Sequence, residues 1–410
     1  MIKKIAVEKL RPGMYIHDLG CNWIQHPFLQ NRLTITSADQ ILKIKKLGVQ
    51  YVYIDTSRGV DVNDIEKNNA VSTNEEPRDL LNLASRRDRT SRRTTHSYAT
   101  ERERALTIKN EAMSMIHHVM DDVIHNREIR VDTVYDIVDD MIESVSRNDQ
   151  ALTTVLRMKS IDEYTYLHSV SVCALFIAFS RCLNLSDDEM REGALGAMLH
   201  DIGKMSVPLT ILNKAGPLTH EEFKIIQLHT TYGKRILDRI DGIPATARDI
   251  AYGHHERYDG SGYPRGLKNS EISAYNKIVS VVDVFDAMTS ERCYSKGATP
   301  DVIIRYLFEL RDKSFAADIV ESFIKCVGIY PVGTCVRLEN GLIGIVNETN
   351  VGNILFPLIT IVFDTKKDRR ITPYTVNLED YTDNDGFSIA STDNPDRWHI
   401  DPFRYVDHAG

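Results

Sequence analysis

Histidines and aspartates recur along one stretch of the sequence in a combination that is typical of metal binding. His200 and Asp201 are adjacent, and so are His254 and His255. Three single residues complete the candidate set, namely His168, His229 and Asp283. Mixed imidazole and carboxylate ligands suit Mn, Fe, Ni or Zn better than Ca or Mg. Two such ions side by side can clamp a phosphodiester during an in-line displacement.

Each of these residues, taken alone, has an ordinary structural explanation. His168 lies in a strongly apolar segment, where a histidine is commonly a satisfied core residue. His229 fits a surface position, and an adjacent pair such as His254-His255 is also commonly found at the surface. The joint occurrence decides between the two explanations, because four imidazole-bearing segments and two buried carboxylates fit one dinuclear site. A buried carboxylate is costly unless it is paired or bound to a cation.

Predicted helices must position these side chains. His200-Asp201 follows a helix that is largely apolar on one face, DDEMREGALGAML, with a capping box at its start, SDDE. A second capping box, THEE, precedes His229 by a short helix. His254-His255 closes the helix PATARDIAYG and is followed by the turn-rich loop ERYDGSGYPRGL, so both imidazoles should face a cleft. Asp283 lies in the apolar helix KIVSVVDVFDAMTS, where a carboxylate needs a partner.

The chain of 410 residues is predicted to be mainly α, with more than one domain. Apolar spacing of three and four residues predicts an all-helical catalytic domain over residues 105–328, with its core at 151–328. Residues 329–410 return to a β-type pattern and predict a small β-rich extension. A hairpin is expected there around Glu339-Asn340-Gly341.

The first hundred residues divide into two parts. Residues 1–62 predict a small α+β domain that we interpret as regulatory. Its strands are expected in LRPGMYI and VQYVYID, and its helix in TSADQILKIKKLG, which ends near Gly48. Residues 63–104 are polar and arginine-rich, and they predict a flexible linker because too little apolar surface is available to order them.

The composition excludes several classes of protein. The formal net charge of −8 argues against broad binding to nucleic acid or to an anionic membrane. No apolar stretch is expected to span a membrane, and the first residues lack the features of a signal peptide. The six cysteines have no CxxC spacing, and we expect reduced thiols in a cytoplasmic protein. They are Cys21, Cys173, Cys182, Cys293, Cys326 and Cys335.

The motifs around these residues resemble those of the HD-GYP family, a subgroup of the HD phosphohydrolases. The matching strings are HDIGK (200–204), PLTHEEF and LHTTYG (217–233), HHERYDGSGYPRGL (254–267) and VVDVFDAMTSERCYSKG (281–297). Residues 1–62 are also similar to an uncharacterised domain often found upstream of HD-GYP domains in bacteria. The resemblance implies hydrolysis of cyclic di-GMP to pGpG or GMP, in second-messenger signalling that controls biofilm formation and motility.

The resemblance further implies a role for each motif residue. One divalent ion would be held by His168, His200, Asp201 and Asp283. The other would be held by Asp201, His229, His254 and His255, with Asp201 and a hydroxide bridging the two ions. Lys204 would act with Asp201 in catalysis by assisting at the phosphate. The residues implied to contact the nucleotide are Lys204, Tyr263, Arg292 and Lys296.

The sequence departs from some members of the family at one position. Those members bind a third ion through a glutamate four residues before the first histidine, and this chain has Tyr164 there. Glu163 is one residue away and should point to another helix face. We therefore expect two divalent transition-metal ions, with Fe or Mn favoured and Ni or Zn as alternatives.

Two other functions are compatible with the same motifs. A phosphodiesterase for another cyclic dinucleotide, such as cyclic GMP-AMP, would differ only in details of the base pocket. A non-catalytic cyclic di-GMP sensor would be favoured by the loss of a ligand, and none is lost. A nucleotide triphosphohydrolase of the wider HD superfamily is disfavoured because the GYP loop is complete. Besides the substrate, a homodimer partner and a GGDEF-type signalling protein are candidate partners.

Overall fold

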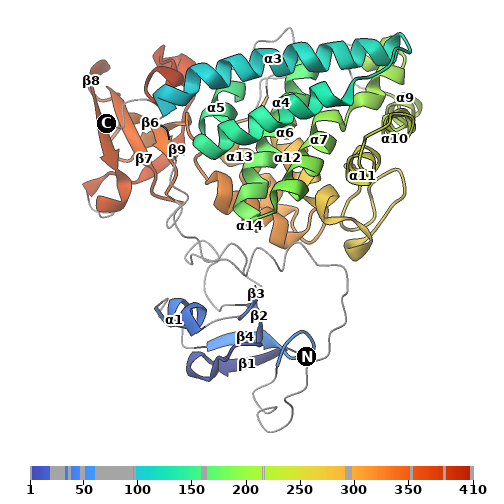
Figure 1. Ribbon diagram of the computed structural model, residues 1–410. Helices are drawn as coiled ribbons and strands as arrows, with labels where there is room; N and C mark the ends of the chain where they lie inside the picture. Colours follow the sequence, from blue (N-terminus) through green and yellow to red (C-terminus); the bar gives the residue numbers. More distant parts are fainter. Residues whose placement is uncertain are drawn as a thin grey trace.

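The chain is mainly helical, with a small sheet before the helices and another after them in the sequence (Figure 1). This computed structural model confirms the predicted mainly α class. It describes residues 2–18, 33–35, 38–46, 51–60, 96, 98–157, 164–214, 216, 218–290, 298–350, 354–381 and 385–406.

The N-terminal sheet has the strand order β1-β4-β2-β3 with antiparallel neighbours. Its elements are β1 (Ile2–Ala6), β2 (Tyr15–Asp18), β3 (Leu33–Thr34), α1 (Ala38–Lys46) and β4 (Tyr51–Asp55). The two predicted strands and the predicted helix are confirmed, whereas β1 and β3 were not predicted. Alternate residues Val52 and Ile54 of β4 are buried, and they pack with Ile16 and Ile44. The predicted helix end at Gly48 lies outside the described residues.

The helical part is built around α6, which packs against α3, α4, α5, α7, α12 and α14. Its helices are α3 (Tyr98–Ile124), α4 (Val131–Arg147), α5 (Ala151–Arg157), α6 (Tyr164–Leu183), α7 (Asp187–Leu199), α8 (Leu209–Leu212), α9 (His220–Gln227), α10 (His229–Leu237), α11 (Ala245–Gly253), α12 (Ala274–Thr289), α13 (Pro300–Glu309) and α14 (Ala317–Val327), with a 3-10 turn η4 (Ile202–Ser206) after α7. The capping boxes predicted at Ser186 and Thr219 are both present, and they start α7 and α9.

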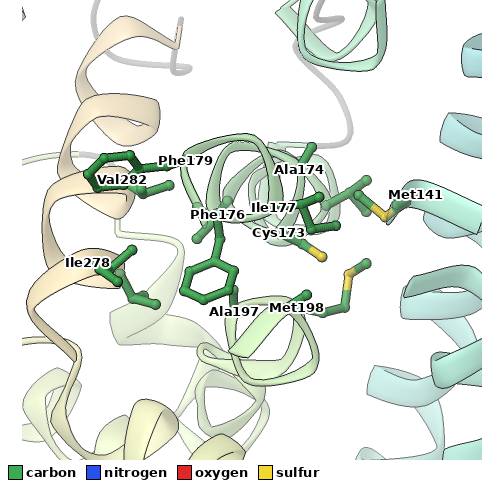
Figure 2. Close-up of a cluster of buried hydrophobic side chains, with 14 of the residues drawn as sticks. Met141, Cys173, Ala174, Phe176, Ile177, Phe179, Ala197, Met198, Ile278 and Val282 are labelled. Atoms are coloured by element: carbon green, nitrogen blue, oxygen red, sulfur yellow. The ribbon is translucent and has the colours of Figure 1, made fainter. Parts of the chain in front are cut away.

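Helix α6 is apolar nearly all round, as expected for a helix buried on every side. Figure 2 shows Phe176 and Ile177 of this helix among side chains of its neighbours. Its segment Tyr166–Leu183 is long and apolar enough to cross a membrane by length and composition, although we expected no such stretch. It is the one such helix in the part of the chain that the structure describes, and 72% of it is buried inside the fold. That burial fits the core helix of a folded domain.

The first long helix begins earlier than predicted. The linker was expected to continue to residue 104, but α3 begins at Tyr98. The reason is an ion pair between Glu101 and Arg147, which the local sequence does not predict. The buried carboxylate of Glu101 accepts two hydrogen bonds of 2.9 Å from the Arg147 guanidinium and one of 2.9 Å from the Ser144 hydroxyl. A paired carboxylate of this kind can start a buried helix face. Residues 61–95, the greater part of the predicted linker, lie outside the described residues.

The C-terminal sheet has the strand order β8-β7-β6-β5-β9 with antiparallel neighbours. Its strands are β5 (Cys335–Leu338), β6 (Leu342–Glu348), β7 (Leu358–Asp364), β8 (Arg369–Asn377) and β9 (Ile389–Thr392). The predicted hairpin joins β5 to β6, and Gly341 supplies the positive φ of +86° that this turn requires. The sheet is tied to the helices by Arg157, whose Nη1 donates to the carbonyl of Val332 at 2.7 Å.

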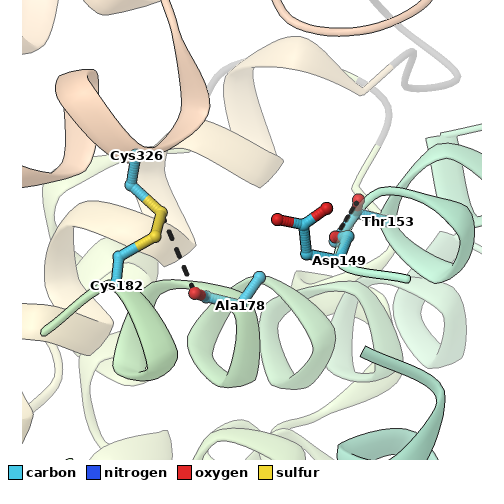
Figure 3. The surroundings of a disulfide bond; sticks show 5 residues. All are labelled: Asp149, Thr153, Ala178, Cys182 and Cys326. Atoms are coloured by element: carbon cyan, nitrogen blue, oxygen red, sulfur yellow. Dashed lines mark hydrogen bonds between the residues drawn. A yellow bond between two sulfur atoms is a disulfide. The ribbon is translucent and has the colours of Figure 1, made fainter. Parts of the chain in front are cut away.

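One expectation about the cysteines is wrong. Cys182 at the end of α6 and Cys326 in α14 form a disulfide, with their Cα atoms 6.0 Å apart (Figure 3). The two residues are separated by 144 positions, and a pairing across that distance leaves no spacing motif in the sequence. Cys173 and Cys335 are free and buried. The remaining two cysteines, Cys21 and Cys293, lie outside the described residues.

Reduction of this disulfide is expected to lower the free energy of unfolding by about 3–5 kcal/mol, because the bond closes a very long loop in the unfolded chain. Denaturant unfolding of the full chain with and without reductant measures this. The double variant Cys182→Ser/Cys326→Ser is the control and should be insensitive to reductant. Equal stability of the wild-type chain in both conditions, with thiol titration showing that the bond had been broken, would contradict the prediction.

Candidate metal centre

The helices bring all seven predicted metal-binding side chains to one place. His168 comes from α6, Asp283 comes from α12, and α10 begins at His229. His200 and His254 are the residues that cap the C-terminal ends of α7 and α11. Asp201 and His255 are the next residues along the chain. Six of the seven are buried, and the side chain of His255 is 20% exposed.

Three overlapping groups of these side chains have ligand atoms within 4.8 Å of one another. The first group is His168, His200 and Asp283. The second group is His229, His254 and His255. The third group joins Asp201 to one histidine from each of the other two, His200 and His254. The arrangement therefore offers two ion positions with a carboxylate between them.

The two oxygens of Asp201 face different groups. Its Oδ2 lies 3.3 Å from Nε2 of His200 and 3.7 Å from Nε2 of His168. Its Oδ1 lies 3.5 Å from Nε2 of His229 and 3.8 Å from Nε2 of His254. A carboxylate in this position can give one oxygen to each of two ions.

Backbone carbonyls fix the tautomers of three of the histidines. Nδ1 of His200 lies 2.7 Å from the carbonyl of Ala197, and Nδ1 of His229 lies 2.7 Å from that of Ile226. Nδ1 of His254 lies 3.1 Å from the carbonyl of Ile250. A carbonyl only accepts, so Nδ1 carries the proton in each ring and Nε2 presents its lone pair to the centre.

Two buried atoms at the centre have no hydrogen-bond partner among the described residues, namely His200 Nε2 and Asp201 Oδ1. Leaving such atoms unsatisfied in the interior costs stability. Both atoms are lone-pair donors that point into the cluster, and a divalent cation would satisfy both. The chemistry of these residues therefore fits a metal ion.

The electrostatics of the cluster suit the same purpose. Burial lowers the pKa of His229 to about 4 and holds the pKa values of His254 and His255 well below the ordinary value, so all three are neutral ligands at pH 7. Burial alone would raise the pKa of Asp201, but the nearby Lys204 and His200 outweigh it and hold that pKa well below its usual range. The centre thus combines lone pairs on neutral rings with a carboxylate that stays charged.

Gly203 allows the two halves of the site to meet. A Cβ at this position would lie 1.9 Å from the carbonyl oxygen of His229 and 2.3 Å from the backbone nitrogen of Gly233. Two backbone segments therefore pass very close to each other here. Only a residue without a side chain lets η4 approach α10 closely enough to place Asp201 beside His229.

Comparisons with known proteins agree with this geometry. An HD domain model matches residues 132–319, and a domain of unknown function (DUF3391) matches residues 2–134. A cyclic di-GMP phosphodiesterase of Pseudomonas aeruginosa is 36% identical over 92% of this chain and 89% of that protein. The chain belongs to the HD-GYP family of phosphodiesterases.

Two other relatives match a shorter part of the chain. A cyclic di-GMP phosphodiesterase of Thermotoga maritima is 42% identical over 40% of this chain and 45% of that protein. A 3'3'-cGAMP-specific phosphodiesterase of Vibrio cholerae is 33% identical over 41% of this chain and 36% of that protein. The match to DUF3391 extends past residues 1–62 through α3 into α4, so this family unit is longer than the domain that we predicted.

The residues predicted to contact substrate are only partly described. Lys204 Nζ donates to Asp201 Oδ2 at 2.5 Å, and a quarter of its side chain is exposed. The ring of Tyr263 lies 4.8 Å from that of His255 between centroids, and burial raises the pKa of its hydroxyl. The aromatic ring of Phe223, which we did not predict, lies 6.4 Å beyond Tyr263 and is 44% exposed. Two further predicted residues, Arg292 and Lys296, lie outside the described residues.

The HD-GYP loop is shaped by a residue that sequence reasoning passed over. The buried carboxylate of Glu256 accepts hydrogen bonds from the backbone N–H groups of Arg265 at 2.8 Å and Leu267 at 3.0 Å. The loop also needs Gly262, because a Cβ there would lie 2.3 Å from the backbone nitrogen of Arg257. Glu256 stands directly after the two histidines, and its place in the motif HHERYDG is the signal that could have identified it.

The Glu256→Gln variant is expected to raise the KM for the phosphodiester substrate about tenfold. It should also lower the free energy of unfolding by about 2 kcal/mol. The reason is that an amide sets an NH2 group against one of the two backbone N–H donors and loosens the loop that carries Tyr263. Steady-state kinetics and denaturant unfolding measure the two effects. Glu271→Gln is the matched control, since exposed Glu271 also accepts from a backbone N–H, that of Lys268 at 2.8 Å. Equal effects in both variants would contradict the role of Glu256.

Proposed function

We propose that this chain hydrolyses cyclic di-GMP to pGpG, GMP or both at two divalent transition-metal ions. The observation that carries the proposal is the position of Asp201, whose two oxygens face two separate histidine groups. The relatives of this chain support the substrate class, because they are named as phosphodiesterases for cyclic di-GMP or 3'3'-cGAMP.

We propose that Asp201 is shared by both ions, with His168, His200 and Asp283 on one side and His229, His254 and His255 on the other. When bound, the ions would polarise the phosphodiester and make a water nucleophilic near neutral pH. Lys204 lies next to the shared carboxylate and is partly exposed, so its ammonium can reach a phosphate oxygen of the substrate. The side chains of Tyr263, Arg292 and Lys296 are proposed to hold the nucleotide.

The choice of metal follows from the ligands. The ligands mix imidazole nitrogens with carboxylates, which suits a divalent transition metal; we propose Fe or Mn, with Ni or Zn as alternatives. A hard cation such as Ca²⁺ prefers oxygen ligands and should bind poorly.

Two ions per chain are expected because position 164 carries no carboxylate. Tyr164 is the first residue of α6, one turn before His168, while its side chain and all of Glu163 lie outside the described residues. A phenol with an ordinary pKa near 10 is a poor ligand beside imidazoles and carboxylates. Elemental analysis of the wild-type chain should give two metals, and Tyr164→Glu should admit a third. Three fully occupied ions in the wild-type chain, or Glu163 acting as a ligand, would contradict this expectation.

The proposed substrate is tested by parallel turnover of cyclic di-GMP and 3'3'-cGAMP with the metal-loaded full chain. We expect cyclic di-GMP to be cleaved with the higher kcat/KM. Preference for 3'3'-cGAMP would establish the alternative that the Vibrio cholerae relative suggests. Tight binding of cyclic di-GMP without cleavage, by protein that holds both ions, would establish a sensor instead.

We also propose a cytoplasmic location and keep a homodimer and a GGDEF-type signalling protein as candidate partners. Disulfides are rare in the reducing cytoplasm. The Cys182–Cys326 disulfide would be an exception to this rule.

A further inference from the structure

Asp286 is a buried carboxylate that touches the candidate metal centre without belonging to any of its three ligand groups. It lies in α12 three residues after Asp283, so both side chains project from one helix face. Its Oδ2 lies 2.8 Å from Nδ1 of His168, and only 3% of the residue is exposed.

This contact decides which nitrogen of His168 can serve as a ligand. A carboxylate only accepts, so Nδ1 of His168 must carry a proton and donate it to Asp286. The other nitrogen, Nε2, is thereby directed at Asp283 Oδ1, which lies 3.1 Å away, and at Asp201 Oδ2, which lies 3.7 Å away. Those oxygens surround the position that an ion of the first group would occupy.

His168 differs in this respect from three other histidines of the centre. His200, His229 and His254 each donate from Nδ1 to a neutral backbone carbonyl. A hydrogen bond to a carboxylate is stronger than one to a neutral carbonyl. A carboxylate partner also makes the imidazole a more basic ligand, as in the carboxylate–histidine–metal arrangement of many metalloproteins.

Asp286 is itself held in place. The Ser290 hydroxyl donates to the backbone carbonyl of Asp286 at 2.5 Å, and its oxygen lies 3.5 Å from Oδ2 of the same residue. The charge of Asp286 also attracts the half-buried Arg157, whose guanidinium donates to the carbonyl of Val332 just before the C-terminal sheet. The carboxylate therefore has little freedom to leave His168.

We propose that Asp286 is a positioning residue, which fixes the proton of His168 on Nδ1 and so sets how tightly the ion of the His168–His200–Asp283 group is held. The proposal rests on the proposed metal site and adds to it. It does not place Asp286 in contact with the ion or with the substrate.

Titration of the chelator-stripped full chain with Mn²⁺ tests the proposal without any assay of activity. In Asp286→Ala we expect one of the two ions to bind about 10–100-fold more weakly, because the His168 ring loses its anchor, while the other ion binds as in the wild type. Asp286→Asn keeps an acceptor oxygen but no charge. Its affinity for the weakened ion should lie between those of the wild type and of Asp286→Ala. Ser280→Ala changes a buried serine of the same helix, whose hydroxyl donates to the carbonyl of Lys277 and not to Asp286, and it is the matched control, expected to bind both ions normally.

Circular dichroism of each variant separates loss of the ion from loss of the fold, and Asp286→Asn provides the reading if Asp286→Ala does not fold. Unchanged Mn²⁺ affinity in both Asp286 variants would overturn the proposal. Equal weakening of both ions, or the same weakening in Ser280→Ala, would also overturn it by showing a general structural role. Failure of the wild-type chain to cleave cyclic di-GMP while binding two Mn²⁺ ions would count against the proposed function alone.

Discussion

The Asp201→Ala variant is expected to lose phosphodiester hydrolysis by about three orders of magnitude or more, which corresponds to about 4 kcal/mol of transition-state stabilisation. Each oxygen of Asp201 faces a different histidine group, so its removal affects both ions at once. The fold should survive the loss of this ion pair, because the partner Lys204 is partly exposed and its ammonium can turn to solvent.

Initial rates of cyclic di-GMP cleavage, elemental analysis and circular dichroism measure the effect of Asp201→Ala. His200→Ala should show a similar loss with the helices intact. Asp188→Ala, an exposed aspartate at the start of α7, is the matched control and should behave as the wild type. An Asp201→Ala variant with normal metal content and a normal rate would contradict the dinuclear assignment.

Removal of the metal is expected to reduce turnover at least about 100-fold, and Mn²⁺ or Fe²⁺ should restore it. The metal should rebind readily at pH 7, because burial keeps the pKa values of His229, His254 and His255 low. Their rings are therefore neutral, and no proton has to leave their ligand nitrogens. His168 is different: burial lowers its pKa, but Asp283 and Asp286 outweigh that and raise it to about 9, so the ion must displace one proton there.

Thermal unfolding is a second measurement of metal binding. An ion that binds only the folded chain stabilises it by about 2.7 kcal/mol at one hundred times its Kd. Mn²⁺ should therefore raise the unfolding temperature of the wild-type chain, and Ca²⁺ should not. Full activity in protein that elemental analysis shows to be metal-free would contradict the prediction.

The side chains of this candidate site could be picked out from the sequence because their residue types are conspicuous. A histidine pair at a helix end and an aspartate within an apolar helix both demand a partner, and the structure brings them together. The capping boxes at Ser186 and Thr219 were equally predictable, since each is a local pattern of four residues.

Features that depend on distant parts of the chain were not predicted. Glu101 pairs with Arg147 across 46 positions, and this pair extends α3 into a stretch that reads as linker. The Cys182–Cys326 bond joins residues 144 positions apart. Asp286 lies within reach of sequence reasoning, because its spacing from Asp283 places both on one face, but its function depends on a histidine 118 positions away.

Anomalous diffraction from crystals of the Mn²⁺-loaded full chain tests the central claim most directly. We expect two peaks, one among His168, His200 and Asp283 and the other among His229, His254 and His255, with Asp201 in contact with both. A single peak, or ions that leave Asp201 without a contact, would contradict the account.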